Sequence, residues 1–138
     1  MKMWSVPVVA ALLAGTCLPA MANDSVLAET SNPKQWAIQT GDYANTRYST
    51  LDQINKENAK DLQVAWTFST GVLRGHEGSP LVIGDMMYVH TPFPNTIFAL
   101  DLAQDGKIVW KYHPQQDPSV IGVMCCDTVY RGLAYADG

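Results

Sequence analysis

The 138-residue sequence is poor in cysteine and in charged residues, and basic residues are its scarcest charged class. Only three residues are cysteine, 16% are charged, and nine Lys and Arg stand against 13 Asp and Glu. The resulting net charge of −4 excludes a basic nucleic-acid-binding surface, and the 47% hydrophobic content excludes a disordered tail. We therefore expect one soluble domain, or part of one.

Several motifs that would identify a common enzyme class are also missing. The sequence contains no zinc-ligand spacing, no glycine-rich phosphate loop and no nucleophile elbow. Its histidines, His76, His90 and His113, show no ligand spacing with one another, so we expect structural roles for them.

The N-terminus has the organisation of a secretory signal peptide. Lys2 is followed by an almost wholly apolar run from 4 to 18, and Ala20-Met21-Ala22 forms a small-x-small cleavage site. We predict removal of residues 1–22 and export of residues 23–138 to the periplasm, with no membrane span after cleavage. The alternatives are an uncleaved anchor, for which the run is short, and a lipoprotein modified at Cys17, whose flanking residues match poorly.

Two stretches with strand periodicity carry the same residue classes. Val64 to Phe68 reads VAWTF, and Ile108 to Tyr112 reads IVWKY, each with apolar residues at alternate positions. Their tryptophans, Trp66 and Trp110, lie 44 residues apart. This spacing falls within the repeat length of β-propeller blades.

The residues between the two tryptophans are predicted to form three further strands separated by turn sequences. These strands are expected at 79–83, 86–91 and 96–101, with turns at 84–85, 92–95 and 105–106. Together with 108–112 they form a four-stranded antiparallel meander, as in one propeller blade. We expect no amphipathic helix after the signal, apart from a turn or two at 55–62, and a further strand from 132 with its turn ending at 138.

The fold class predicted from this pattern is all-β, the N-terminal portion of a propeller that is incomplete in this chain. One blade cannot bury both of its faces, so a propeller requires several blades closed into a ring. We therefore interpret residues 23–138 as the first blades of a larger protein, truncated here, and expect this piece not to fold cooperatively by itself.

Two loops concentrate the residues that could carry chemistry. Residues 74–80 read RGHEGSP and follow the first tryptophan strand, and residues 125–132 read CCDTVYRG and follow the second. In a meander blade such a connection leads from the outermost strand of one blade to the innermost strand of the next. Both loops are thus predicted to reach the same end of the propeller, beside its axis.

The adjacent cysteines of the second loop, Cys125 and Cys126, have three possible states in an oxidising compartment. They could bond to each other, pair with partners elsewhere in a longer protein, or remain buried free thiols. A bond between neighbours requires a twisted peptide and would present a rigid, polarizable plate of two sulfurs. Such a plate suits a planar conjugated ligand.

Two charged residues accompany the cysteine pair at the predicted axial site. Arg131 offers a planar guanidinium fork suited to a carboxylate or quinone oxygen, and Glu77 can accept a hydrogen bond from a ligand. Taken singly, each is equally consistent with a solvated loop charge or an ordinary salt bridge. Their convergence with Cys125 and Cys126 favours a ligand site.

The sequence resembles a known family, the large subunits of pyrroloquinoline quinone (PQQ) dependent methanol dehydrogenases. Within this family it is most similar to the lanthanide-dependent XoxF type. The resemblance covers most of residues 23–138. It rests on four stretches: DYANTRYSTLDQIN (42–55), AWTFSTGVLRGHEGSPLV (65–82), HTPFPN (90–95) and MCCDTVYRGLAY (124–135). Two positions depart from the family pattern, Tyr130 for a common asparagine and Gly122 for a frequent proline.

The resemblance implies an eight-bladed propeller with tryptophan docking between blades and PQQ on its axis. It further implies that Cys125 and Cys126 form a vicinal disulfide against the cofactor, that Glu77 hydrogen-bonds it, and that Arg131 lies at a quinone oxygen. The family oxidises a primary alcohol, here methanol, to the aldehyde and passes electrons to a c-type cytochrome. A lanthanide(III) or calcium ion acts as Lewis acid there.

For this chain the resemblance places the metal ligands and the catalytic aspartate beyond residue 138, so these residues alone should be inactive. The full-length protein is expected to be a homodimer. Two alternatives remain at this stage: a calcium-dependent PQQ enzyme for ethanol or another alcohol, and a non-enzymatic periplasmic propeller that serves as a binding scaffold. A binding scaffold of this kind would not require the adjacent cysteine pair.

Overall fold

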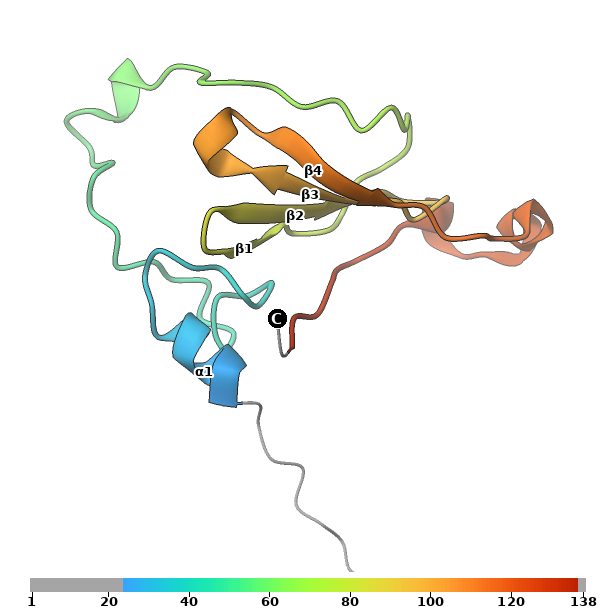
Figure 1. Ribbon diagram of the computed structural model, residues 1–138, viewed down its shortest axis with the longest axis horizontal. Coiled ribbons are helices and arrows are strands. Elements are labelled where there is room, and N and C mark those ends of the chain that lie inside the picture. The colour runs from blue at the N-terminus through green and yellow to red at the C-terminus, as the bar shows by residue number, and fades with distance from the viewer. Residues whose placement is uncertain (1–23, 137–138) are drawn as a thin grey trace, which may run out of the picture.

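A computed structural model describes residues 24–136 and shows one four-stranded antiparallel sheet preceded by a short helix (Figure 1). The helix is α1, Asp24–Thr30. The strands are β1 (Leu81–Ile83), β2 (Met86–His90), β3 (Ile97–Asp101) and β4 (Lys107–Tyr112), and they pair in chain order. The predicted signal peptide, residues 1–22, lies outside the described residues.

The four strands confirm the predicted meander. β1 and β2 are joined at Gly84, whose φ of +60° suits a tight turn. Asp105 and Gly106 take φ values of +52° and +76° in the turn into β4. The predicted all-β class and the four-stranded antiparallel sheet expected for one blade are therefore correct.

The centre of the sheet is buried because a different segment of the chain covers each of its two faces. The register places Tyr88, Ala99 and Trp110 on one face, and the rings of Tyr88 and Trp110 lie 5.9 Å apart. The opposite face carries Phe98, which meets Phe68 edge to face at 5.1 Å. Figure 1 shows the segment near residue 65 and the C-terminal segment on opposite sides of the sheet.

The prediction of a strand around Trp66 is wrong for this chain. No residue from 62 to 70 pairs with a neighbouring strand in the part of the chain that the structure describes. The alternating pattern is nevertheless used for packing, because Trp66 and Phe68 are half-buried against the sheet while Thr67 and Ser69 are exposed. Periodicity reports which side chains are buried, whereas a strand also requires a hydrogen-bonded partner.

Trp66 docks onto the turn between β3 and β4. A Cβ atom built on Gly106 would lie 2.6 Å from Cζ3 of Trp66, so the indole lies directly on a glycine that is itself buried. The tryptophan of the first repeat thus contacts the sheet that contains the second tryptophan, Trp110. The described residues contain one sheet, so tryptophan docking between blades stays a prediction.

A β-bulge breaks the alternation predicted for β4. Ala99 lies opposite Trp110, but its neighbour Leu100 lies opposite Ile108, which leaves Val109 without a partner on β3. Ile108 and Trp110 consequently point to opposite faces of the sheet, although they are two residues apart. The periodicity of the sequence could not reveal this insertion.

Two further expectations concerning the ends of the chain are wrong. Helix α1 was not expected, because seven residues are too few to show a helical period; it buries Val26, which is only 4% exposed. Residues 132–136 form no strand and instead run beside Tyr88 and Trp110.

The predicted turn at 55–62 is present as a single 3-10 turn, Ala59–Asp61. No helix within residues 24–136 has the length and apolar character needed to cross a bilayer.

The outer strand leads to the first testable prediction, on cooperativity. Every residue of β4 is exposed, including Ile108, Val109, Trp110 and Tyr112 at 43–56%. A sheet with so much apolar surface in water lacks the burial that gives a sharp unfolding transition. We expect residues 23–138 alone to melt gradually, as followed by circular dichroism and calorimetry. A reversible melt with equal calorimetric and van't Hoff enthalpies would contradict this.

Candidate functional site

The two loops predicted to carry the site meet in the structure and are joined by two ion pairs. Arg74 Nη1 lies 3.1 Å from Asp127 Oδ1, and Arg131 Nε lies 3.9 Å from Glu77 Oε2. These side chains are 39–73% exposed, so each pair contributes little to stability. Their value is geometric, because they show that residues 74–77 and 127–131 share one surface.

The second loop has an unusual backbone around its cysteine pair. The structure joins Cys125 to Cys126 in a disulfide. The next three φ values, at Cys126, Asp127 and Thr128, are all between +61° and +67°. Left-handed backbone costs about 1–2 kcal/mol per non-glycine residue, so this turn is strained and must be held by its surroundings.

Buried contacts at its end hold this turn. Thr128 is only 3% exposed, and its carbonyl oxygen accepts a hydrogen bond of 3.1 Å from the backbone N–H of Phe93. Phe93 belongs to the loop between β2 and β3, so the sheet itself anchors the turn. The disulfide and Asp127 remain exposed at the surface.

The first loop is ordered by His76. Its Nδ1–H donates to the carbonyl oxygen of Arg74 at 2.8 Å, and the Thr70 hydroxyl donates to its Nε2 at 3.1 Å. These bonds fix the backbone immediately before Glu77, whose side chain is 54% exposed. Glu77 is thus presented to solvent from a constrained loop. His76 has a structural role, as expected.

His90, at the end of β2, lies buried beneath both loops. It is 6% exposed, its ring lies 4.5 Å from that of Tyr130, and neither ring nitrogen has a hydrogen-bond partner among the described residues. A Cβ atom on Gly78 would lie 1.9 Å from its Cε1. Burial lowers the pKa of His90 below its usual value, so the neutral form is favoured.

The structure thus brings Glu77 and Arg131 together, and the disulfide of Cys125 and Cys126 begins the loop that ends at Arg131. Sequence reasoning did not identify Arg74, Asp127 or the packing of His90 on Gly78 and Tyr130. Arg74 lies in one loop motif and Asp127 in the other. Their opposite charges were the only sequence signal for an ion pair between the two loops. No group of three potential metal-ligating side chains is present within residues 24–136.

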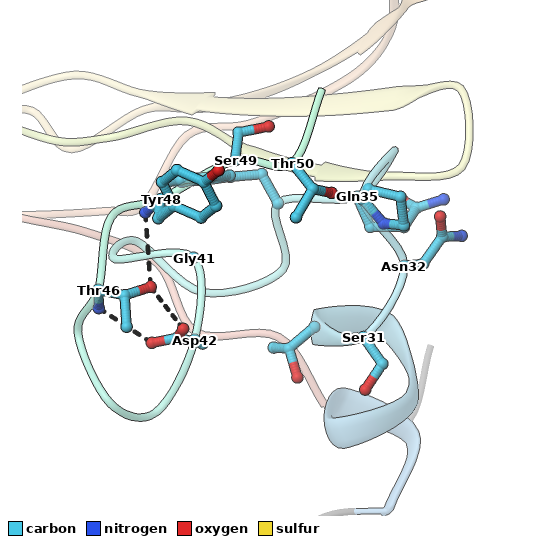
Figure 2. Close-up of a pocket in the computed structure, with 12 residues that line it drawn as sticks. Ser31, Asn32, Gln35, Gly41, Asp42, Thr46, Tyr48, Ser49 and Thr50 are labelled. Atoms are coloured by element: carbon cyan, nitrogen blue, oxygen red, sulfur yellow. Dashed lines mark hydrogen bonds between the residues drawn. The ribbon is translucent and has the colours of Figure 1, made fainter. Parts of the chain in front are cut away.

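A separate pocket of about 440 Å³ lies near the N-terminus (Figure 2). Its rim includes Asp42, whose carboxylate accepts hydrogen bonds from the backbone N–H and the hydroxyl of Thr46 at 3.0 and 2.6 Å. These bonds lower the pKa of Asp42. The carboxylate is engaged in its own loop, and the pocket does not include Glu77, Arg131 or the disulfide.

Comparison with known proteins agrees with the fold and with the loop motifs. Residues 36–138 match the family model described as PQQ: Glucose/ethanol/alcohol dehydrogenase, beta-propeller domain. The chain belongs to this family of PQQ β-propeller dehydrogenases. This confirms the resemblance noted from its sequence.

Individual relatives place the chain more narrowly, beside methanol dehydrogenases. It is 75% identical over 120 residues to the lanthanide-dependent methanol dehydrogenase of Methylorubrum extorquens, covering 87% of this chain and 20% of the relative. It is 54% identical over 123 residues to methanol dehydrogenase [cytochrome c] subunit 1 of Paracoccus denitrificans, covering 89% and 20%. The structure of a europium-containing methanol dehydrogenase superposes with a TM-score of 0.81 at 54% identity, covering 84% and 20%. The chain spans about a fifth of the length of these relatives.

The residues present fit the chemistry of PQQ, a planar quinone that carries carboxylates. Arg131 can donate to a quinone or carboxylate oxygen, Glu77 can accept from a ring N–H, and two sulfurs offer a polarizable surface. Glu77 and Arg131 are 54% and 73% exposed, so their polar atoms remain accessible to a ligand. The donor set is that expected for one edge and one face of such a cofactor.

Proposed function

We propose that residues 23–138 form the first blades of a periplasmic PQQ-dependent alcohol dehydrogenase, from which residues 1–22 are removed as a signal peptide. The enzyme oxidises methanol, or another primary alcohol, to the aldehyde and passes electrons to a c-type cytochrome. The observation that carries this proposal is the meeting of loops 74–77 and 125–131, with the ion pair between Glu77 and Arg131. The names of the relatives support the substrate and the electron acceptor.

In this proposal, the residues of this chain bind and orient the cofactor. PQQ, when bound, supplies the ortho-quinone that takes two electrons and two protons from the alcohol. Arg131 stabilises negative charge at a cofactor oxygen, Glu77 fixes the orientation by accepting a hydrogen bond, and the Cys125–Cys126 pair packs against the ring. The metal ion, a lanthanide(III) or calcium, and the catalytic base come from outside these residues, and the whole enzyme is a homodimer.

The proposal is tested in a grafted enzyme. The host is the Methylorubrum extorquens relative, and its matching segment is replaced by the segment of the present chain. The unchanged relative is the control. We expect the grafted enzyme to bind PQQ and to reduce a dye with methanol at a rate close to that of the control. A folded grafted enzyme that binds no PQQ would contradict the proposal and favour a scaffold role.

Arg131 provides the second test in the same protein. Arg131→Gln removes the charge and the fork, whereas Arg131→Lys keeps the charge alone. We expect the glutamine variant to bind PQQ about tenfold more weakly, since a charge-assisted hydrogen bond contributes about 1.5–3 kcal/mol when buried, and the lysine variant to be intermediate. Titration of the apoenzyme with PQQ measures the affinity. Equal affinities in all three proteins would exclude Arg131 from the cofactor site.

A further inference from the structure

We infer that His90 is a positioning residue that sets the spacing between the two cofactor-binding loops. This inference rests on the proposed function. The imidazole lies between Gly78, the neighbour of Glu77, and Tyr130, the neighbour of Arg131. It therefore contacts each loop one residue away from the side chain that would bind the cofactor.

Two contacts define the position of the ring. On one side the imidazole lies so close to Gly78 that a built Cβ atom would be 1.9 Å from Cε1 and 2.0 Å from Nε2. On the other side its centroid lies 4.5 Å from that of Tyr130, with the planes inclined at 54°. Only glycine fits at residue 78 while His90 occupies this position.

The ring acts through its shape. His90 is 6% exposed, and its two nitrogens have no hydrogen-bond partner in the described part of the chain. It is also rigidly mounted, because it ends β2 and pairs with Ile97 of β3. The sheet thus fixes one surface against which both loops rest. The ion pair between Glu77 and Arg131, at 3.9 Å, is the exposed consequence of this spacing.

This role makes a specific prediction about shape complementarity. His90→Ala removes the ring, and Gly78→Ala adds a methyl group that forces the ring away; each should weaken PQQ binding by the grafted enzyme about tenfold. In the double variant the methyl group occupies part of the space left by the ring. We therefore expect the double variant to bind PQQ no more weakly than either single variant, which is the non-additivity of contacting residues.

A second readout does not require the cofactor. Hydrogen exchange of the PQQ-free grafted enzyme should become faster in both loops, 74–79 and 125–131, in His90→Ala, while β3 is unchanged. His113→Ala is the matched control. This histidine is exposed at the end of the same sheet, and its Nδ1 is hydrogen-bonded to the Thr96 hydroxyl. It should alter neither the exchange of the loops nor the affinity for PQQ.

Each outcome decides the inference. Faster exchange of both loops, together with weaker PQQ binding and a non-additive double variant, supports it. Unchanged loops, a change in one loop only, faster exchange throughout the sheet, or additive losses would overturn it. If the unmodified grafted enzyme binds no PQQ, the proposed function fails, whereas the exchange experiment still decides whether His90 spaces the loops.

Discussion

Cys125→Ser in the grafted enzyme is expected to weaken PQQ binding and dye reduction by about ten- to a hundredfold while the propeller stays folded. Contacts between sulfur and an aromatic ring contribute up to about 1.5 kcal/mol each. The substitution removes one sulfur and breaks the bond that holds the other sulfur against the cofactor. The propeller should remain folded, because a bond between adjacent residues closes almost no loop and constrains the unfolded chain very little.

The backbone of the second loop adds to this loss. Cys126, Asp127 and Thr128 all have left-handed φ values, a conformation that non-glycine residues rarely adopt in sequence. Without the disulfide the loop can relax, which moves Asp127 away from Arg74 and shifts Arg131 relative to Glu77. Loss of the sulfur surface and loss of orientation should therefore occur together.

The measurement is titration of each apoenzyme with PQQ, followed by dye reduction with methanol. Cys125→Ser/Cys126→Ser is the matched variant, because it removes the unpaired thiol that the single substitution leaves behind. Both variants should bind PQQ more weakly than the unmodified grafted enzyme. Mild reduction of the unmodified grafted enzyme, which breaks the bond but keeps both sulfurs, should reproduce the part of the loss that comes from orientation. Full turnover in the double variant would exclude the disulfide from the cofactor site.

The sequence predicts the sheet well because a meander depends on local signals. Turn residues such as Gly84 and Gly106 lie between short apolar runs, and antiparallel neighbours along the chain pair directly. Trp66 shows the limit of this approach. Its segment has the strand period, but strand formation depends on a distant partner that a local pattern does not contain. The bulge at Val109 is similarly invisible, because it changes pairing without changing composition.

The sequence indicates the candidate site residues more readily than the residues that support them. Glu77, Cys125, Cys126 and Arg131 are exposed residues of unusual loops, and their chemistry is evident from residue type. His90 was assigned a structural role, but what it supports depends on a contact with Gly78 across the fold. Such a contact requires three-dimensional placement, since twelve residues separate the two and neither is unusual in its own segment.

Gly106→Ala is expected to loosen the sheet strongly, because this glycine meets two requirements at once. Its φ of +76° is unfavourable for alanine, and a Cβ atom there would lie 2.6 Å from the indole of Trp66. Together, left-handed backbone and overpacking should cost about 3 kcal/mol. In the grafted enzyme this corresponds to hydrogen exchange of β4 that is faster by about a hundredfold.

Gly84→Ala separates the two causes. Gly84 has a φ of +60°, but a Cβ atom there would meet nothing within 4 Å, so only the backbone cost of about 1–2 kcal/mol applies. The destabilisation by Gly106→Ala beyond that by Gly84→Ala therefore measures the contact of Trp66 with the turn. Adding Trp66→Leu to Gly106→Ala should remove the steric part of that excess. If Gly106→Ala and Gly84→Ala accelerate exchange equally, Trp66 does not hold this blade, and the packing of the first repeat against the second must come from Phe68 and Phe98 instead.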